Sequence, residues 1–132
     1  MRGRLLVTSL GVLMAAAPVW AHHGLAAEFD IDKSVDLQGT VTEWELVNPH
    51  SWIHMDVKDE KGQVVNWAVE GGSPNNLLRL GFSKASLPVG TEIVVHGFQA
   101  KDGSARVVGK YVTFPDGRKL FLGLQSSETK EK

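Results

Sequence analysis

Histidine is the residue type with the sharpest chemical meaning in this 132-residue chain, which contains no cysteine. Without cysteine, thiolate metal sites and catalysis by thiols are excluded. Imidazole is the commonest side-chain ligand for zinc, copper and nickel. The first candidates for ligand binding are therefore the five histidines: His22, His23, His50, His54 and His96.

His22 and His23 directly follow a segment with the features of an export signal. Cleavage after Ala21 would make His22 the N-terminal residue, whose free amine and ring nitrogen can chelate one metal ion together. This arrangement is similar to the copper brace of lytic polysaccharide monooxygenases and copper-binding periplasmic proteins, and His23 would add a nearby donor. Without a metal, the same residues would form a solvated N-terminus, which must be ordered before it can supply a strong site. The sequence thus makes copper, or a similar metal, the candidate ligand.

A second group of candidates follows the turn at Asn48-Pro49. Even spacing places His50, Trp52 and His54 on one face of a strand, with the two histidines about 13 Å apart along it. One ion cannot bind both histidines at that distance unless the Pro49 turn bends His50 back. Trp52 either belongs to the core or offers a stacking surface for a sugar, a peptide or another ring-bearing ligand.

The other candidates have less specific surroundings. His96 alternates with Val95. It is either a surface histidine of the barrel whose ring nitrogens are hydrogen-bonded, or a further contact of a ligand site. Trp44 and Trp67 lie among strand residues that alternate with charge, so we expect them in the core.

No motif of a known catalytic class accompanies these residues. A G-x-S-x-G nucleophile elbow is missing, and the Gly-Gly-Ser-Pro run at 71–74 is explained by a strand end and a helix cap. The carboxylates at 28–32 lie in a polar segment where solvated charge is the ordinary role. A phosphate-binding loop with its lysine is also missing. We therefore expect a protein that is not an enzyme.

Residues 1–21 have the three parts of a secretory signal peptide. Arg2 and Arg4 form the positive region, residues 5–17 are apolar, and Ala21 is the small residue required at the cleavage position. The apolar stretch is shorter than the ~20 residues that span a bilayer, which argues against a membrane anchor. We expect a periplasmic protein with a domain over 22–124, a polar disordered tail over 125–132, and no membrane span after signal removal.

The composition is that of a folded globular domain. Hydrophobic residues make up 42% of the chain, and 14 basic residues nearly balance 15 acidic ones, which excludes a collagen-like fibre or a wholly disordered chain. The length fits one domain. Removal of residues 1–21, which hold two arginines, leaves 12 basic and 15 acidic residues and a net charge of -3. Such a domain lacks the excess of positive charge that binding to nucleic acid requires.

Hydrophobic alternation predicts five or six strands. In the first strand the alternation runs through Leu37, Gly39 and Val41 and then shifts by one register to Trp44, which predicts a bend at Gly39 or near Thr42. The later strands are expected over residues 52–57, 64–69, 91–99 and 106–114, with a short added strand over 118–122.

One short helix is expected between the third and fourth strands. Ser73 is its predicted N-cap, Pro74 occupies the first helical position, and Gly81 ends it. Three leucines are predicted to face the core: Leu77, Leu78 and Leu80. Three strands, a helix and two strands is the order of the five-stranded OB barrel, whereas a sandwich needs about seven strands. We predict an all-β fold, a small five- to six-stranded OB-like barrel.

Several stretches of the mature chain have a distinctive composition: residues 22–24 with 27–30, 39–42 leading to 47–54, 66–68 with 72–75, and 115–121. They resemble a family of small exported bacterial proteins that carry a domain of unknown function. The most specific stretch is Asn-Pro-His-Ser-Trp-Ile-His at 48–54, and the chain departs from the pattern at Gly24 and Leu25, where a Ser-Phe type pair is expected. The resemblance implies an exported barrel of the same kind, without an assigned activity.

Together these features predict an exported periplasmic binding module that holds copper or a similar metal through His22, helped by His23, His50 or His54. The alternative is a metal-independent protein-interaction or envelope-stress protein, which would contact its partner through the Trp52 face. In that alternative His96 is a further candidate contact.

Overall fold

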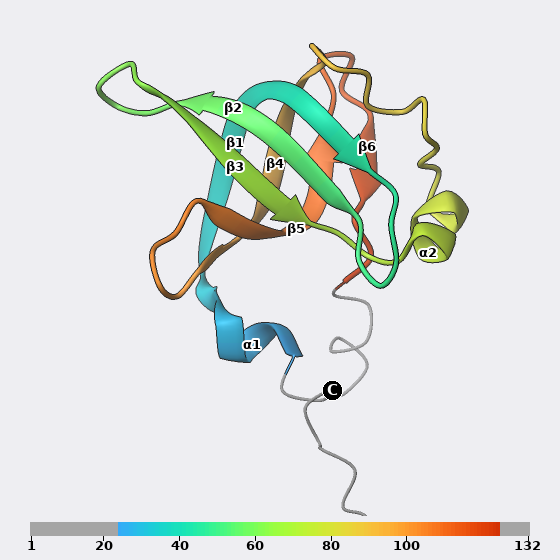
Figure 1. Cartoon of the computed structure of the whole chain (residues 1–132), viewed down its shortest axis with the longest axis horizontal. Coiled ribbons are helices and arrows are strands. Elements are labelled where there is room, and N and C mark those ends of the chain that lie inside the picture. Colours follow the sequence, from blue (N-terminus) through green and yellow to red (C-terminus); the bar gives the residue numbers. More distant parts are fainter. Residues whose placement is uncertain (1–23, 125–132) are drawn as a thin grey trace, which may run out of the picture.

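Alternating hydrophobic residues build six strands that curl into a ring-shaped sheet (Figure 1). The computed structural model describes residues 24–124. The elements in chain order are α1 (Gly24–Glu28), β1 (Phe29–Glu45), β2 (Trp52–Lys58), β3 (Val64–Glu70), α2 (Pro74–Arg79), β4 (Glu92–Ala100), β5 (Arg106–Thr113) and β6 (Lys119–Phe121).

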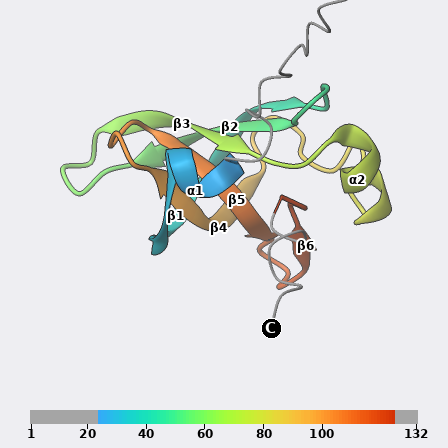
Figure 2. The ribbon, with the colours of Figure 1, turned by 90° about the horizontal axis from the view of Figure 1, so that it is seen from below.

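The strand order is β3-β2-β1-β4-β5-β6, and an additional pairing of β3 with β5 closes the ring. That closing pair is parallel and joins Ala68–Glu70 to Arg106–Val108, whereas the other pairs are antiparallel. The helix α2 lies between β3 and β4 in the chain and stands beside the barrel, well away from α1, in both views (Figures 1 and 2). The predicted all-β barrel of five to six strands, with a short helix between strands 3 and 4, is confirmed.

β1 belongs to both halves of the barrel. Its first part pairs with β4 up to Thr40, and its last part pairs with β2 from Thr40 onward. A register shift between Val41 and Glu43 marks a β-bulge, which confirms the bend expected near Thr42. Gly39 lies at the same corner, where a Cβ atom would approach the carbonyl oxygen of Asp56 to 2.1 Å. The backbones of β1 and β2 therefore come together only because residue 39 has no side chain.

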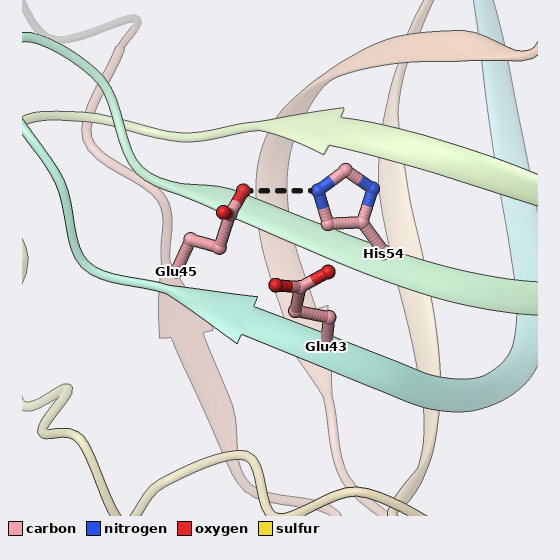
Figure 3. Close-up of side chains that lie close together, drawn as sticks. All are labelled: Glu43, Glu45 and His54. Carbon is pink, nitrogen blue, oxygen red and sulfur yellow. Dashed lines mark hydrogen bonds and ion pairs between the residues drawn. The ribbon is translucent and has the colours of Figure 1, made fainter.

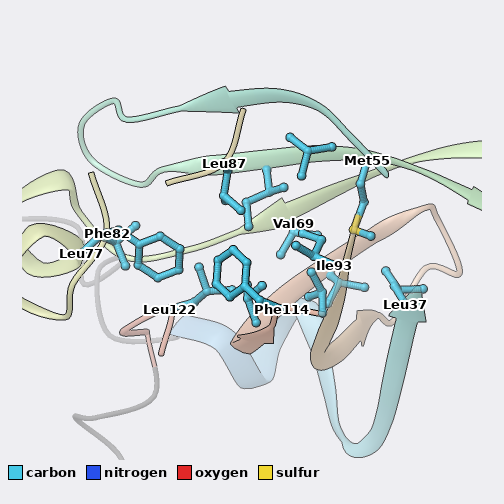
Figure 4. Packing of buried hydrophobic residues seen from close by; sticks show 14 residues of the cluster. Leu37, Met55, Val69, Leu77, Phe82, Leu87, Ile93, Phe114 and Leu122 are labelled. Atoms are coloured by element: carbon cyan, nitrogen blue, oxygen red, sulfur yellow. The ribbon is translucent and has the colours of Figure 1, made fainter. Parts of the chain in front are cut away.

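The core fills the inside of the barrel (Figure 4). Ile53 and Met55 of β2 are 1% and 0% exposed, as their alternation predicts. Trp44 and Trp67 are partly buried against this cluster, and the Trp44 indole Nε1 donates a hydrogen bond to the carbonyl of Ser83 at 2.9 Å. The tryptophans predicted to be core residues thus lie at its border, where an indole can bury its rings and still bond its N–H.

Two sequence-based expectations about the helices are wrong. Of the three leucines predicted to face the core, only Leu77 does so, since Leu78 is 53% exposed and Leu80 is 37% exposed. A helix of six residues completes fewer than two turns, so only a narrow stripe of it reaches the barrel. The polar segment before the first strand also contains α1, and β1 begins at Phe29, where a second, smaller core cluster with Ala100 and Val108 buries it.

Ser73, Pro74 and Gly81 have their predicted roles. The Ser73 hydroxyl accepts a hydrogen bond from the backbone N–H of Asn76, Pro74 opens the helix, and Gly81 has a φ of 103°. No helix within residues 24–124 is long and apolar enough to cross a membrane.

Replacing Gly39 by alanine should lower the free energy of unfolding by about 1–3 kcal/mol, as overpacking does elsewhere, because the added methyl group meets the Asp56 carbonyl. Urea denaturation at neutral pH measures the change. Gln38→Ala, at the neighbouring exposed position of β1, is the matched control. A loss for Gly39→Ala no larger than that of the control would show that the corner tolerates a side chain.

Candidate functional site

Several side chains that could bind a metal or another ligand lie on the outer face of β1, β2 and β3. Trp52 of β2 pairs in register with Glu45 of β1 on one side and with Glu70 of β3 on the other. His54, two residues further along β2, pairs with Glu43. Because directly paired residues share a face of the sheet, a tryptophan, a histidine and three carboxylates are collected on this surface.

The bulge in β1 decides that the two β1 carboxylates reach this surface. Val41 pairs with Met55 and is fully buried, whereas Glu43 pairs with His54 on the outside. Residues two apart on a regular strand share a face, so Glu43 would follow Val41 inward if Thr42 were not an extra residue. The bulge resets the alternation, after which Trp44 faces the core border and Glu45 faces outward.

Glu43, Glu45 and His54 form a cluster in which one ligand atom from each side chain lies within 4.8 Å of the other two (Figure 3). The His54 Nε2 and Glu45 Oε2 atoms are 3.1 Å apart, and their side chains are 28% and 39% exposed. Donors around a four-coordinate zinc ion with bonds of 2.0–2.2 Å are separated by about 3.4 Å. The His54–Glu45 pair, at 3.1 Å, is close to that separation, and a Glu43 ligand atom lies within 4.8 Å of both.

His50 and Glu70 make a second histidine–carboxylate pair on the other side of Trp52. The His50 Nδ1 and Glu70 Oε1 atoms are 2.5 Å apart, and Glu70 is only 11% exposed. An ionised carboxylate only accepts hydrogen bonds, so Nδ1 carries the proton and Nε2 is the nitrogen with a lone pair for a ligand. Carboxylates orient metal-binding histidines in this way.

The structure separates the predicted ligands. His50 is not part of the group formed by Glu43, Glu45 and His54. His96 lies on β4, where it pairs with Asp36, so it takes no part in the β2 face. His22 and His23 lie outside the described residues, as do the segments predicted to be a signal peptide and a polar tail.

Sequence reasoning missed the carboxylates of the site. Glu43 and Glu45 alternate just before Asn48-Pro49, and His54 and Trp52 mirror them just after it. A hairpin around this turn brings these residues opposite each other, which was the available signal. Glu70 of β3 pairs with Trp52 of β2, and no comparable pattern in the sequence indicated this pairing.

Comparison with known proteins adds a family but no activity. The model of DUF6152, a family of unknown function, matches residues 10–109. Neither the curated proteins nor the solved structures contain a match.

Replacing His50 by alanine should destabilise the fold by about 1–2 kcal/mol, because the buried Glu70 carboxylate loses its donor. Glu45→Gln should change stability by less than about 1 kcal/mol, since the Glu45 carboxylate is more exposed than that of Glu70. Urea denaturation of both variants measures the difference.

The cost of His50→Ala should shrink when Glu70 is also changed to glutamine, which carries no charge. Equal costs in the two backgrounds would mean that His50 stabilises the fold by packing rather than through Glu70.

Proposed function

The chain belongs to DUF6152, a family of unknown function, and we propose that it is an exported binding module that holds one transition-metal dication on the outer face of β1 and β2. The ligands are the carboxylates of Glu43 and Glu45 and the imidazole of His54. The observation that supports this proposal is the convergence of their three ligand atoms within 4.8 Å.

The strands favour binding because they hold the ligands in place before the metal arrives. Glu43 and Glu45 lie on β1 and His54 lies opposite on β2, within a continuous hydrogen-bonded ladder. Ligands on rigid elements lose little conformational freedom when they bind. Two carboxylates also balance the charge of a dication, so the occupied site carries no net charge.

The ligand set selects among metals. An imidazole nitrogen suits copper, zinc and nickel, whereas magnesium and calcium prefer sites made of oxygen alone. Copper(II) stands at the top of the general affinity order of divalent first-row metals. Copper is therefore the expected strongest ligand, with zinc as the second.

A different class of function has a separate observation in its favour. Trp52 is half-buried between Glu45 and Glu70, which gives an aromatic surface with an acidic border. Aromatic residues with satisfied polar neighbours are common at the centres of protein interfaces. The second candidate is a metal-independent interaction protein that contacts a periplasmic partner or an envelope component through this face.

Export and the N-terminal histidines complete the proposal. Removal of residues 1–21 places His22 at the N-terminus, where its amine and ring nitrogen form a copper-binding pair beside His23. This N-terminal pair and the strand cluster are two separate metal sites that substitutions can distinguish.

The mature protein with His22→Ala and His23→Ala should still bind one copper(II) or zinc ion, measured by calorimetry. Further changing His54 to glutamine or Glu43 to glutamine should weaken binding by more than about tenfold. Loss of a group that only supports a ligand already weakens metal binding by about that much, and loss of the ligand itself should cost more. Lowering the pH should release the metal, because protons compete for the imidazole and carboxylate ligand atoms.

Glu60→Gln is the matched control, since Glu60 is an exposed carboxylate in the turn between β2 and β3. Unchanged binding after loss of His54 and Glu43 would refute the strand site. Loss of partner capture in Trp52→Ala, together with no metal uptake, would support the interaction function.

The protein exported to a bacterial periplasm should have the mass of residues 22–132 and should retain copper through its N-terminus. Native mass spectrometry before and after mild exposure to copper(II) measures both. The N-terminal site would be refuted if the exported protein began at a residue other than His22, or if the His22→Ala variant retained as much copper as the original protein. Neither result bears on the strand site.

A further inference from the structure

A second cluster of polar side chains lies on the outer face of β1, β4 and β5. Asp36, His96 and Thr113 come from these three neighbouring strands. The His96 Nδ1 atom is 2.5 Å from Asp36 Oδ1, and the His96 Nε2 atom is 3.2 Å from Thr113 Oγ1. Both nitrogens of one imidazole are thus engaged, one by a carboxylate and the other by a hydroxyl.

The partners of His96 set the direction of these hydrogen bonds. An ionised Asp36 only accepts, so the proton of the neutral ring is on Nδ1. The lone pair of Nε2 then accepts the hydroxyl proton of Thr113. A carboxylate that orients an imidazole, which in turn accepts a proton from a hydroxyl, is the arrangement that activates alcohol nucleophiles.

An aromatic ring stacks on the face of the His96 imidazole, in addition to the two hydrogen bonds at its nitrogens. The Tyr111 ring stacks on His96 with a centroid separation of 4.3 Å and an angle of 25°. Lys119 of β6 is paired with Thr113, and its Nζ lies 4.9 Å from the centroid of the Tyr111 ring. The cluster therefore has a cation on the same face of the sheet, at the ring of Tyr111.

Thr113 also lines a hollow of about 170 Å³ that is open to solvent. The walls are more apolar than polar and include Ile93, Val94, Phe114 and Pro115. A hollow of this size has room for a short acyl chain but not for a large ligand, since pockets for drug-sized molecules are about 300–1,000 Å³. Thr113 is the last residue of β5 and Phe114 follows it, so the residue that carries the hydroxyl also borders the hollow.

We propose that Asp36, His96 and Thr113 form a site that hydrolyses small acyl esters through an acyl-threonine intermediate. This activity is independent of the metal site, and no catalytic motif in the sequence points to it. Thr113 and His96 are its catalytic residues, and Asp36, which is exposed, is a positioning residue that fixes the tautomer and the orientation of the ring.

The reaction proceeds in two balanced steps. Thr113 Oγ1 bonds to the carbonyl carbon of the ester while its proton passes to His96 Nε2, and the alcohol leaves with that proton as the ester C–O bond breaks. Water then attacks the acyl-threonine and gives a proton to Nε2. Thr113 takes this proton back as the carboxylic acid departs.

Hydrolysis of p-nitrophenyl acetate by the mature protein in the presence of EDTA tests this proposal, because the chelator removes hydrolysis by bound metal. Thr113→Val and His96→Gln should each lower the protein-dependent rate by about 100-fold, the scale of general-base catalysis, and Thr113→Ser should retain it. Mass spectrometry of protein quenched during turnover should find the acetyl group on Thr113.

Asp36→Asn should lower the rate and shift its pH profile, while Asp36→Glu should restore part of the rate. Thr40→Val, which removes a threonine hydroxyl of β1 outside the cluster, is the control and should match the original protein. Circular dichroism establishes that each variant is folded, and if Thr113→Val is not, the comparison of Asp36→Asn with Asp36→Glu decides. Equal rates in all folded variants, or acetyl groups only on lysines or the N-terminus, would overturn the proposal.

Discussion

The structure depends on the single strand β1 serving two neighbours at once. Its first part pairs with β4 and its last part pairs with β2, so the strand must turn a corner without breaking its hydrogen bonds. Gly39 allows the backbones to approach at that corner, and the bulge at Thr42 adds the bend. The same bulge reverses which side chains face outward, so the geometry that closes the barrel also exposes Glu43 and Glu45 beside His54.

Each histidine in the described part of the chain is held by a carboxylate from a neighbouring strand. His50 contacts Glu70, His54 contacts Glu45, and His96 contacts Asp36. These contacts fix ring orientation on surfaces where an unpaired imidazole would sample several rotamers. The pairs differ in their second partner: a further carboxylate near His54 favours a metal, whereas a hydroxyl at His96 favours proton transfer. For this reason we propose different chemistry for the two outer faces.

Much of the architecture followed from local signals. The period-two pattern of Ile53 and Met55 predicted the buried side of β2, and the register shift before Trp44 predicted the bend. The exposed leucines of α2 show where such signals fail, because a pattern of hydrophobic residues does not reveal how narrow the contact of a six-residue helix is. The start of β1 at Phe29 was also missed, since its burial comes from the distant residues Ala100 and Val108.

The sequence by itself determined the strands, the capped helix and the OB-like order, because hydrophobic alternation, Ser-Pro caps and glycine turns act over a few residues. It also identified the histidines as the chemically distinctive side chains. Only the tertiary structure decided their partners. Glu70, Glu45 and Asp36 lie 20, 9 and 60 residues from their histidines, and such pairs depend on strand register around a closed ring. A shift of one residue in that register would turn every pair to the opposite face.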